Sequence, residues 1–236
     1  MRVDHHMKII VLTFTRVGMA LYQSLQLPWF SEPALKPFPI LIYGASTATG
    51  AIAIQYARLS GLDVIAVCSS RNFEYVKSLG ATTVFDYNSP TCAADIKTYT
   101  NGNIQHALDC VSEGDSVRLT IESMNSDSGI YCNILNLERE ETTDLYNPRI
   151  QAKWVLGYTA VGEYFVLDDH EYAAKPEDEV FARDLWRRSS HLLENRSVRA
   201  HRHAVNKYGC GFDGILAGLD AMRHGKISGE KLVYTL

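Results

Sequence analysis

The sequence predicts an α/β fold built on a doubly wound, mostly parallel sheet. Three observations support this prediction. After residue 39, short apolar runs alternate with longer helical patterns. Successive runs lie roughly 20 to 25 residues apart, enough for a right-handed crossover through a helix. A glycine-containing turn, Y-G-A-S-T-A-T-G (Tyr43 to Gly50), joins the first run to the first helical pattern.

The elements of the sheet region follow from these runs. A helix is expected first, because Val17, Leu21 and Leu25 recur at helical spacing. It leads into a linker with four of the seven prolines, Pro28, Pro33, Pro37 and Pro39, which exclude regular helix. We expect strands at residues 40–43, 63–68, 83–85, 106–110 and 130–135, with helices between them at 48–59, 72–79, 92–99 and 115–124.

The C-terminal part alternates less regularly. The acidic run 168–179 is expected to be a solvated loop. The expected elements are a strand at 154–158, a helix at 177–194, an alternating stretch at 198–205, a helix at 212–222 and a final strand at 231–236.

Composition excludes several classes of function. The chain has 236 residues with 46% hydrophobic and 21% charged, so it can bury a full core. Its net charge of -4 argues against nucleic acid and anionic membranes as partners. No apolar run approaches the ~20 residues of a membrane helix. The five cysteines are spread singly without a C-x-x-C pair, which favours a reducing compartment, and we expect the cytoplasm.

The turn between the first strand and helix is suited to phosphate. Helix N-terminal amides point outward there, Gly44 permits the turn, and Gly50 allows close packing. A Walker loop is excluded because Thr49-Gly50-Ala51 lacks the lysine. A nucleophile elbow, G-x-S-x-G, remains a lesser alternative, although the pattern from Gly44 to Ser46 ends at Ala48.

The end of the second strand indicates which dinucleotide would bind. An NAD site normally has Asp or Glu there for the ribose 2′-hydroxyl. This chain reads A-V-C-S-S-R-N, residues 66–72, with hydroxyls and a cation that suit a 2′-phosphate. The prediction is therefore NADP(H), with the alternative that Arg71 is a surface residue that starts a helix.

These stretches together resemble a known family. The series L-I-Y-G-A-S-T-A-T-G, C-S-S-R-N-F-E-Y-V-K-S-L-G-A-T-T-V-F-D-Y, H-A-L-D-C and G-K-I-S-G-E-K-L-V is similar to the medium-chain dehydrogenase/reductase superfamily. It most resembles the fungal trans-acting enoyl reductases of polyketide biosynthesis (lovastatin enoyl reductase-like). The resemblance implies hydride transfer from NADPH to the β-carbon of an α,β-unsaturated thioester. The implied partner is a polyketide synthase or its acyl carrier domain, and a monomer is expected.

The resemblance also implies site residues. The family's phosphate loop matches Ser46, Thr47, Ala48 and Thr49 of this chain. The family's 2′-phosphate loop matches Ser69, Ser70, Arg71 and Asn72. Other cofactor contacts match Tyr87 beside the adenine, Leu135 and Asn136 near the nicotinamide, and Gly229 and Glu230 near the C-terminus. Substrate contacts match Val17, Gly18, Met19, Ala20, Leu21, Tyr22, Gln23 and Ser24, and also Thr159, Ala160, Val161, Gly162 and Glu163. Tyr87 as a turn aromatic and Gly229 as a helix-exit glycine are the plain alternatives.

The chain departs from the family pattern at its N-terminus. Relatives begin with a GroES-like catalytic domain of roughly a hundred residues, which residues 1–15 do not match. We therefore expect an N-terminal remnant with the linker (1–39), an NADP-binding Rossmann domain (40–160), and a C-terminal segment returning to the catalytic-domain remnant (161–236). Turnover is expected to be low without the lid.

No metal and no catalytic proton donor are assigned. His201 and His203 have strand spacing and could share a face, but no third ligand accompanies them, so a solvent-facing strand edge is expected. His5 and His6 are expected in an unstructured terminus. Two other functions stay open, namely a quinone or alkenal reductase and a non-catalytic module that binds nucleotide or docks a synthase.

Overall fold

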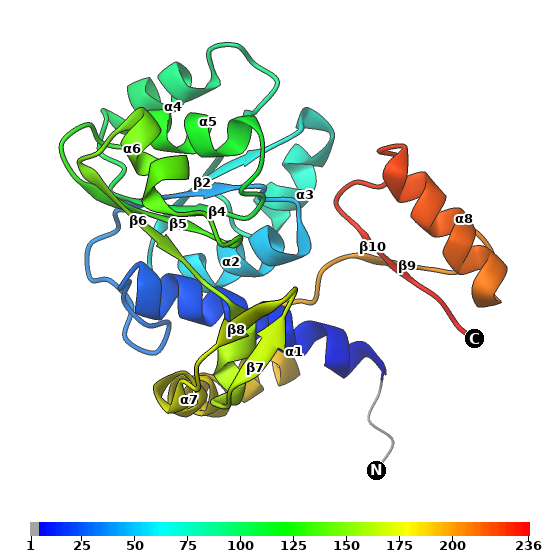
Figure 1. Ribbon diagram of the computed structural model, residues 1–236. Coiled ribbons are helices and arrows are strands. Elements are labelled where there is room, and N and C mark those ends of the chain that lie inside the picture. Colours follow the sequence, from blue (N-terminus) through cyan, green and yellow to red (C-terminus); the bar gives the residue numbers. More distant parts are fainter. Residues whose placement is uncertain (1–4) are drawn as a thin grey trace.

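A six-stranded parallel sheet forms the centre of the molecule, with helices on both faces (Figure 1). The computed structural model describes residues 5–236, with side chains from residue 12 onward. The strands run in the order β3-β2-β1-β4-β5-β6, which is the doubly wound order. They are β1 (Pro39–Tyr43), β2 (Asp63–Cys68), β3 (Thr83–Asp86), β4 (His106–Asp109), β5 (Gly129–Asn133) and β6 (Ile150–Trp154). The predicted fold class is confirmed.

The sheet is buried on both faces, which explains its continuous apolar strands. In β1, Ile40 and Ile42 enter one core cluster and Leu41 and Tyr43 enter the other. The helices of the first cluster are α1 (His5–Gly18), α2 (Ala48–Leu59), α3 (Phe73–Ser78) and α7 (Pro176–Glu194), and the helices over the other face are α4 (Cys92–Thr100), α5 (Asp115–Ser123) and α6 (Thr143–Tyr146).

The sequence located most of these elements closely. The helix at 48–59 and the strand at 63–68 have the predicted bounds. The strand at 154–158 was wrong, because residues 150–154 pair with β5 and the 3₁₀ helix η4 (Gly157–Val161) follows. Since β6 is an edge strand with polar Gln151 and Lys153, its apolar pattern is weak. The helix at 72–79 is split into a 3₁₀ turn, η2 (Ser70–Asn72), and α3.

The N-terminal helix is longer than predicted. It starts at His5, so an unstructured terminus is wrong for that residue and for His6, whereas residues 1–4 lie outside the described part. α1 continues into a π-helical segment, η1 (Met19–Ser24). The following residues up to Phe38 contain no helix or strand, which confirms the proline-rich linker.

α1 is held against α7 by an aromatic contact. The rings of Phe14 and Trp186 stack with centroids 5.7 Å apart, and Trp186 Nε1 donates a hydrogen bond to Thr15 Oγ1 at 3.0 Å. The missing side chain of Gly18 gives room to Leu185, whose Cδ2 would lie 2.2 Å from an added Cβ. The first and last parts of the chain thus share one core with the sheet domain.

The C-terminal part forms two small units beside the main sheet. An antiparallel hairpin, β7 (Phe165–Leu167) and β8 (His170–Tyr172), occupies part of the run 168–179, so a loop is wrong for that part and for the start of α7. A second unit joins β9 (His203–Val205), α8 (Gly211–Arg223) and β10 (Lys231–Val233), with β9 parallel to β10. Figure 1 shows this unit beside the α3 edge of the sheet domain. The predicted stretches 198–205 and 231–236 are strands over only three residues each.

All five cysteines are free, and all except Cys210 are buried. Burial raises the pKa of the Cys68 and Cys132 thiols to about 12, so both stay protonated and pack as small apolar side chains. Among the described residues, no helix is both long and apolar enough to cross a membrane. The predicted domain boundaries at residues 39 and 160 stay predictions.

Candidate nucleotide-binding site

The turn between β1 and α2 presents unpaired backbone amides. Gly44 adopts the left-handed φ of +68° that turns the chain. The Thr47 amide donates a hydrogen bond to the Gly44 carbonyl at 2.9 Å, which closes the turn. Thr47 caps α2, because its Oγ1 accepts a hydrogen bond from Gly50 N at 3.0 Å. The amides of Ala48 and Thr49 lie in the first turn, where no helix carbonyl can reach them. An anion is favoured at this point by those amides and by the helix dipole.

Gly50 lets the helix start lie directly on the turn. A Cβ at this position would lie 2.3 Å from Gly44 O and 2.7 Å from Ala45 Cα, closer than any real contact. Both neighbours are backbone atoms and cannot rotate away. The close packing predicted for Gly50 is therefore confirmed, and it fixes the direction of the Ala48 and Thr49 amides.

The turn lies at the switch point of the sheet, where the order of the strands reverses between β1 and β4. β1 has β2 on one side and β4 on the other, with Ile42 beside Ala66 and Leu108. In open α/β sheets, ligands bind outside the carboxyl ends of the strands at this switch point. The ends of β1, β2 and β4 therefore surround the candidate site.

A buried aspartate, Asp109, organises the end of β4. Its Oδ1 accepts hydrogen bonds from the amides of Val111 and Ser112, both at 2.9 Å. Its Oδ2 accepts from Ser116 Oγ at 2.7 Å and Tyr131 Oη at 3.1 Å. Burial raises the pKa of this carboxyl, while these hydrogen bonds oppose the rise. Sequence reasoning assigned Asp109 no role, although an Asp that ends an apolar strand is a visible signal.

Asn72 connects the two predicted phosphate loops. It is only 3% exposed, and its Nδ2 lies 3.3 Å from Ser46 Oγ, 3.2 Å from Ser69 Oγ and 2.9 Å from Ser228 Oγ. Its Oδ1 accepts a hydrogen bond from Arg202 Nη2 at 3.1 Å. The structure thus brings Ser46, Ser69 and Asn72 together, and the Asn72 carboxamide is occupied by protein partners.

Ser70 and Arg71 are exposed beside Asn72. Ser70 interacts with Asp86 at the end of β3. The Asn88 amide most strongly, and also the amide and hydroxyl of Ser70, hold the pKa of Asp86 below its usual value. Ser70 is therefore partly engaged by a carboxylate, which leaves Arg71 as the charged group of the loop.

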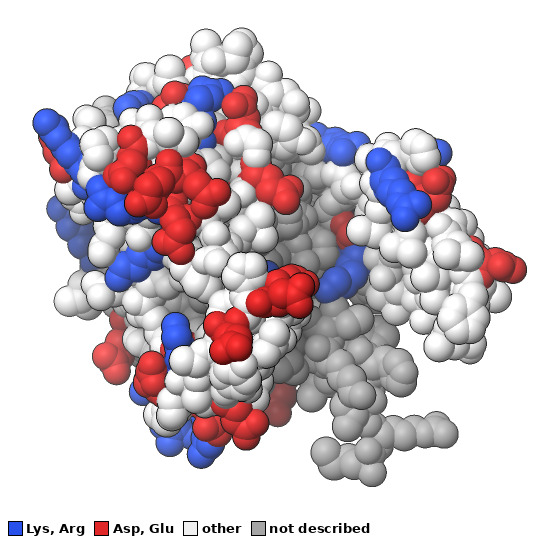
Figure 2. Space-filling model, viewed as in Figure 1, with Lys and Arg blue, Asp and Glu red and all other residues white. Residues whose placement is uncertain are grey.

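An open pocket of about 640 Å³ lies between this loop and the C-terminal unit. Figure 2 shows a hollow between these parts, with basic side chains at its edge. The only carboxylate in the lining, Glu230, forms an ion pair with Lys207. The lining residues are Arg71, Ala200, His201, Arg202, His203, Lys207, Lys226, Ser228 and Glu230. Together with the unpaired amides of α2, this donor set fits a nucleotide that carries several phosphates.

Gly229 permits the C-terminal contact with Asn72. It has a φ of +63°, and an added Cβ would lie 2.5 Å from Asn72 Oδ1 and 2.6 Å from Arg202 Nη2. Glu230 lines the pocket, and Gly229 lies beside it against Asn72 and Arg202. Their role as cofactor contacts stays a prediction. Sequence reasoning missed Arg202, Lys207, Lys226 and Ser228, although basic residues are dense in R-A-H-R-H and G-K-I-S-G-E-K.

The residues expected beside the adenine and the nicotinamide lie at other strand ends. Tyr87 follows β3, is 41% exposed, and its ring lies 6.2 Å from the ring of Tyr43. Leu135 and Asn136 follow β5 and are exposed. These three positions line the same carboxyl edge of the sheet as the turn after β1.

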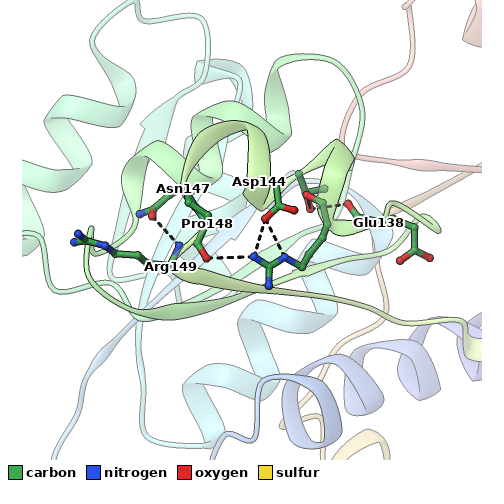
Figure 3. Close-up of polar contacts among 7 residues, drawn as sticks. Glu138, Asp144, Asn147, Pro148 and Arg149 are labelled. Carbon is green, nitrogen blue, oxygen red and sulfur yellow. Dashed lines mark hydrogen bonds and ion pairs between the residues drawn. The ribbon is translucent and has the colours of Figure 1, made fainter.

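The segment after Asn136 is braced by polar contacts (Figure 3). Arg139 Nη2 donates to Asp144 Oδ1 at 2.7 Å and to the Pro148 carbonyl at 3.4 Å. Thr142 Oγ1 donates to the Glu138 carbonyl at 2.9 Å.

The two predicted substrate segments lie side by side, but their side chains differ in accessibility. η4 packs against α1 and α7, and a Cβ on Gly157 would meet Leu12 and Arg16. In the first segment, Gln23 Nε2 donates to Asp178 Oδ1 at 3.1 Å. Six of its residues are buried: Val17, Gly18, Met19, Ala20, Leu21 and Tyr22. In the second segment Thr159 and Gly162 are buried, Ala160 is half-buried, and Val161 and Glu163 are exposed.

The predicted solvent-facing strand edge is wrong for His201, whereas His203 is exposed on β9 as predicted. His201 precedes β9, is half-buried, and its Nδ1 lies 2.9 Å from Tyr75 Oη. Burial, with the charges of Arg202 and Lys231, lowers the pKa of His201 to about 4. Within residues 5–236 no three His, Cys, Asp or Glu side chains gather as a metal site requires, so zinc does not fit the described residues.

Comparisons with known proteins find one matching family model and several similar fungal proteins. A family model described as "Zinc-binding dehydrogenase" matches residues 48–153. The chain is 44% identical to the dual trans-enoyl reductase/FAD-dependent monooxygenase tazHJ of Aspergillus terreus, over 90% of this chain and 30% of that protein. It is 40% identical to the trans-enoyl reductase ACTTS2 of Alternaria alternata, over 94% of this chain and 62% of that protein. The chain thus spans less than two thirds of these relatives' length.

Solved structures show the same fold. The CurK enoyl reductase matches with a TM-score of 0.69 at 16% identity, over 94% of this chain and 60% of that chain. A putative zinc-dependent alcohol dehydrogenase from Rhizobium etli matches with a TM-score of 0.70 at 22% identity, over 95% of this chain and 62% of that chain. The chain is therefore similar over nearly its whole length to fungal proteins named trans-enoyl reductases, and it shares its fold with these solved structures.

Proposed function

We propose that this chain binds NADPH and acts as a trans-enoyl reductase on an α,β-unsaturated polyketide thioester. One observation carries the proposal: the start of α2 presents unpaired amides, and a basic pocket lies nearby at the end of β2. The first suits a pyrophosphate, and the second suits a phosphate on the adenosine ribose. The names of the relatives supply the reaction class.

In this proposal, each group of site residues binds a different part of NADPH. The amides of Ala48 and Thr49 would hold the pyrophosphate, with Ser46 and Thr47 as hydroxyl neighbours. Ser69, Ser70 and Arg71 would face the ribose 2′-phosphate, while Asn72 holds the loops in place. Tyr87 would lie against the adenine, and Leu135 and Asn136 would lie near the nicotinamide. Gly229 and Glu230 would close the site from the C-terminal side.

NADPH, when bound, supplies the hydride for the β-carbon of the substrate. The protein's part is to align the alkene, to exclude water and to stabilise the negative charge on the thioester oxygen. Residues 17–24 and 159–163 are the proposed substrate side, and their exposed members Val161 and Glu163 are accessible to an acyl chain. The proposed partner is a polyketide synthase or its acyl carrier domain, with the chain acting as a cytoplasmic monomer.

Two measurements test this proposal. Fluorescence titrations with NADPH and with NADH give the two dissociation constants, and an absorbance assay at the nicotinamide band follows NADPH consumption with a crotonyl thioester. The proposal predicts tighter binding of NADPH and consumption that depends on the thioester. Arg71→Gln should reduce the preference for NADPH, whereas Arg149→Gln, at the opposite end of the sheet, should not.

The other outcomes separate the competing functions. Consumption with a quinone but not with the thioester would replace the enoyl reductase by a quinone reductase. NADPH binding without consumption on any acceptor would leave only a nucleotide-binding module. If neither nucleotide binds, the oxidoreductase function is overturned.

A further inference from the structure

The basic pocket has a second wall, which the C-terminal unit supplies. Arg71 lies on the β2 side, whereas Arg202 and Lys226 come from the segments around β9 and β10. Among the described residues these three cations form no ion pair with a carboxylate, and Lys207 is already paired with Glu230. Cations that face one pocket repel one another, so a dianionic group would stabilise this arrangement.

Arg202 is held in place before any ligand arrives. Its Nε donates to the Gly229 carbonyl at 2.9 Å and its Nη2 to Asn72 Oδ1 at 3.1 Å. Its guanidinium carbon lies 3.8 Å from the centre of the Tyr75 ring, which supports it from below. These contacts use Nε and Nη2 and leave Nη1 for a ligand. A guanidinium fixed in this way loses little side-chain entropy when it binds a phosphate.

We propose that Arg202 binds the ribose 2′-phosphate of NADPH from the C-terminal side of the pocket, opposite Arg71, and helps to select NADPH over NADH. The inference rests on the proposed function, because it names a further specificity residue of the same site. Asn72 lies between Arg202 and the hydroxyls of Ser46 and Ser69. Recognition of the 2′-phosphate is thereby connected to the turn that would bind the pyrophosphate.

Adenosine fragments isolate this contact from the rest of the cofactor. Calorimetric titrations compare adenosine 2′,5′-bisphosphate with adenosine 5′-monophosphate on the unmodified chain, on Arg202→Gln and on Arg149→Gln. Glutamine keeps an amide that can donate to Asn72 or Gly229 but removes the charge. Arg149 is an exposed arginine before β6, at the far end of the sheet, and its ion pair is with Asp127.

The expected result is selective. Arg202→Gln should weaken binding of the 2′,5′-bisphosphate about tenfold or more, as loss of a charge-assisted hydrogen bond implies. Binding of the 5′-monophosphate should change little, and Arg149→Gln should bind both fragments like the unmodified chain. Arg202→Lys, which keeps the charge without the planar fork, should fall between the two.

Three results would overturn the inference. Equal weakening of both fragments in Arg202→Gln would show a merely structural role. An unchanged affinity for the 2′,5′-bisphosphate would remove Arg202 from the site. If the unmodified chain binds adenosine 3′,5′-bisphosphate more tightly than adenosine 2′,5′-bisphosphate, the pocket would be assigned to a 3′-phosphate such as that of coenzyme A. If the unmodified chain prefers NADPH in any of these cases, the proposed function stands and only the role of Arg202 fails.

Discussion

Asn72 Oδ1 accepts a hydrogen bond from Arg202 Nη2 at 3.1 Å, across 130 residues of sequence. This contact ties the end of the second strand to the C-terminal unit. The same Asn72 side chain reaches Ser46 in the turn after β1. Three segments that are distant in the chain therefore share one buried carboxamide, and the candidate phosphate sites are parts of one network.

Gly229→Ala should disrupt this network. The alanine Cβ would lie 2.5 Å from Asn72 Oδ1, so the Asn72–Arg202 contact has to open. The expected result is NADPH binding weakened about tenfold, which corresponds to about 1.4 kcal/mol. Gly225→Ala is a matched control, because Gly225 has a φ of +64° with no atom within 4 Å. Equal NADPH affinities of the two variants, measured by fluorescence titration, would refute the network's role.

Gly50→Ala should destabilise the protein, although alanine normally favours a helix by about 1 kcal/mol over glycine. The new Cβ would press on Gly44 O and Ala45 Cα, and backbone atoms there cannot move without opening the turn. We expect a loss of about 2 kcal/mol or more in the free energy of unfolding, as overpacking typically causes. Urea denaturation measures this change, and a stabilised variant would contradict the packing described here.

Thr47→Val should lower stability by about 1 kcal/mol, because valine keeps the shape but cannot accept the hydrogen bond from Gly50 N. Thr47→Ser retains an accepting hydroxyl and should lose much less. Thermal unfolding of both variants checks the prediction. Similar midpoints for valine and serine would show that the cap does not contribute.

Asp109→Asn should cost about 2 kcal/mol of stability, within the range for a buried hydrogen-bonded group. The asparagine would place an NH₂ group against two of the four donors that the carboxylate now accepts. Asp127→Asn, on an exposed ion pair, serves as the control and should leave stability nearly unchanged. Chemical denaturation compares the two, and an equally small effect at Asp109 would mean that its network is not stabilising.

His201 should make stability depend on pH. Its pKa is lowered to about 4 in the folded chain, from 6.5 in the unfolded chain. Between these values the unfolded chain binds a proton that the folded chain does not. The contribution of neutral His201 to the free energy of unfolding is therefore fully present above pH 6.5 and is lost as the pH falls toward 4. Unfolding midpoints measured from pH 7 to 4 should decline less steeply for His201→Asn. Parallel declines would contradict the assignment.

The sheet and its central helix could be predicted from sequence because their signals are local. Residues 48–59 and 63–68 are apolar runs bounded by turn residues, and their bounds were correct. β6 was misplaced because an edge strand carries polar residues such as Gln151 and Lys153. The hairpin β7–β8 was missed because its composition, with D-D-H-E, is that of a loop.

The candidate site was predicted only in part for a similar reason. Ser46 to Thr49 and Ser69 to Asn72 are contiguous motifs, and the structure brings members of both together. Arg202 carries no motif and reaches the site only through the position of the C-terminal unit. A contact set by tertiary structure cannot be read from spacing, and this limit also applies to the hydrogen bond from Tyr131 to Asp109.

A crystal structure of the chain with NADP⁺ is the most direct test of the central claim. The predicted result places pyrophosphate oxygens within hydrogen-bond distance of the Ala48 and Thr49 amides and the 2′-phosphate in the basic pocket, between Arg71 and Arg202. A nucleotide bound elsewhere, or a 2′-phosphate turned to solvent away from both arginines, would contradict it.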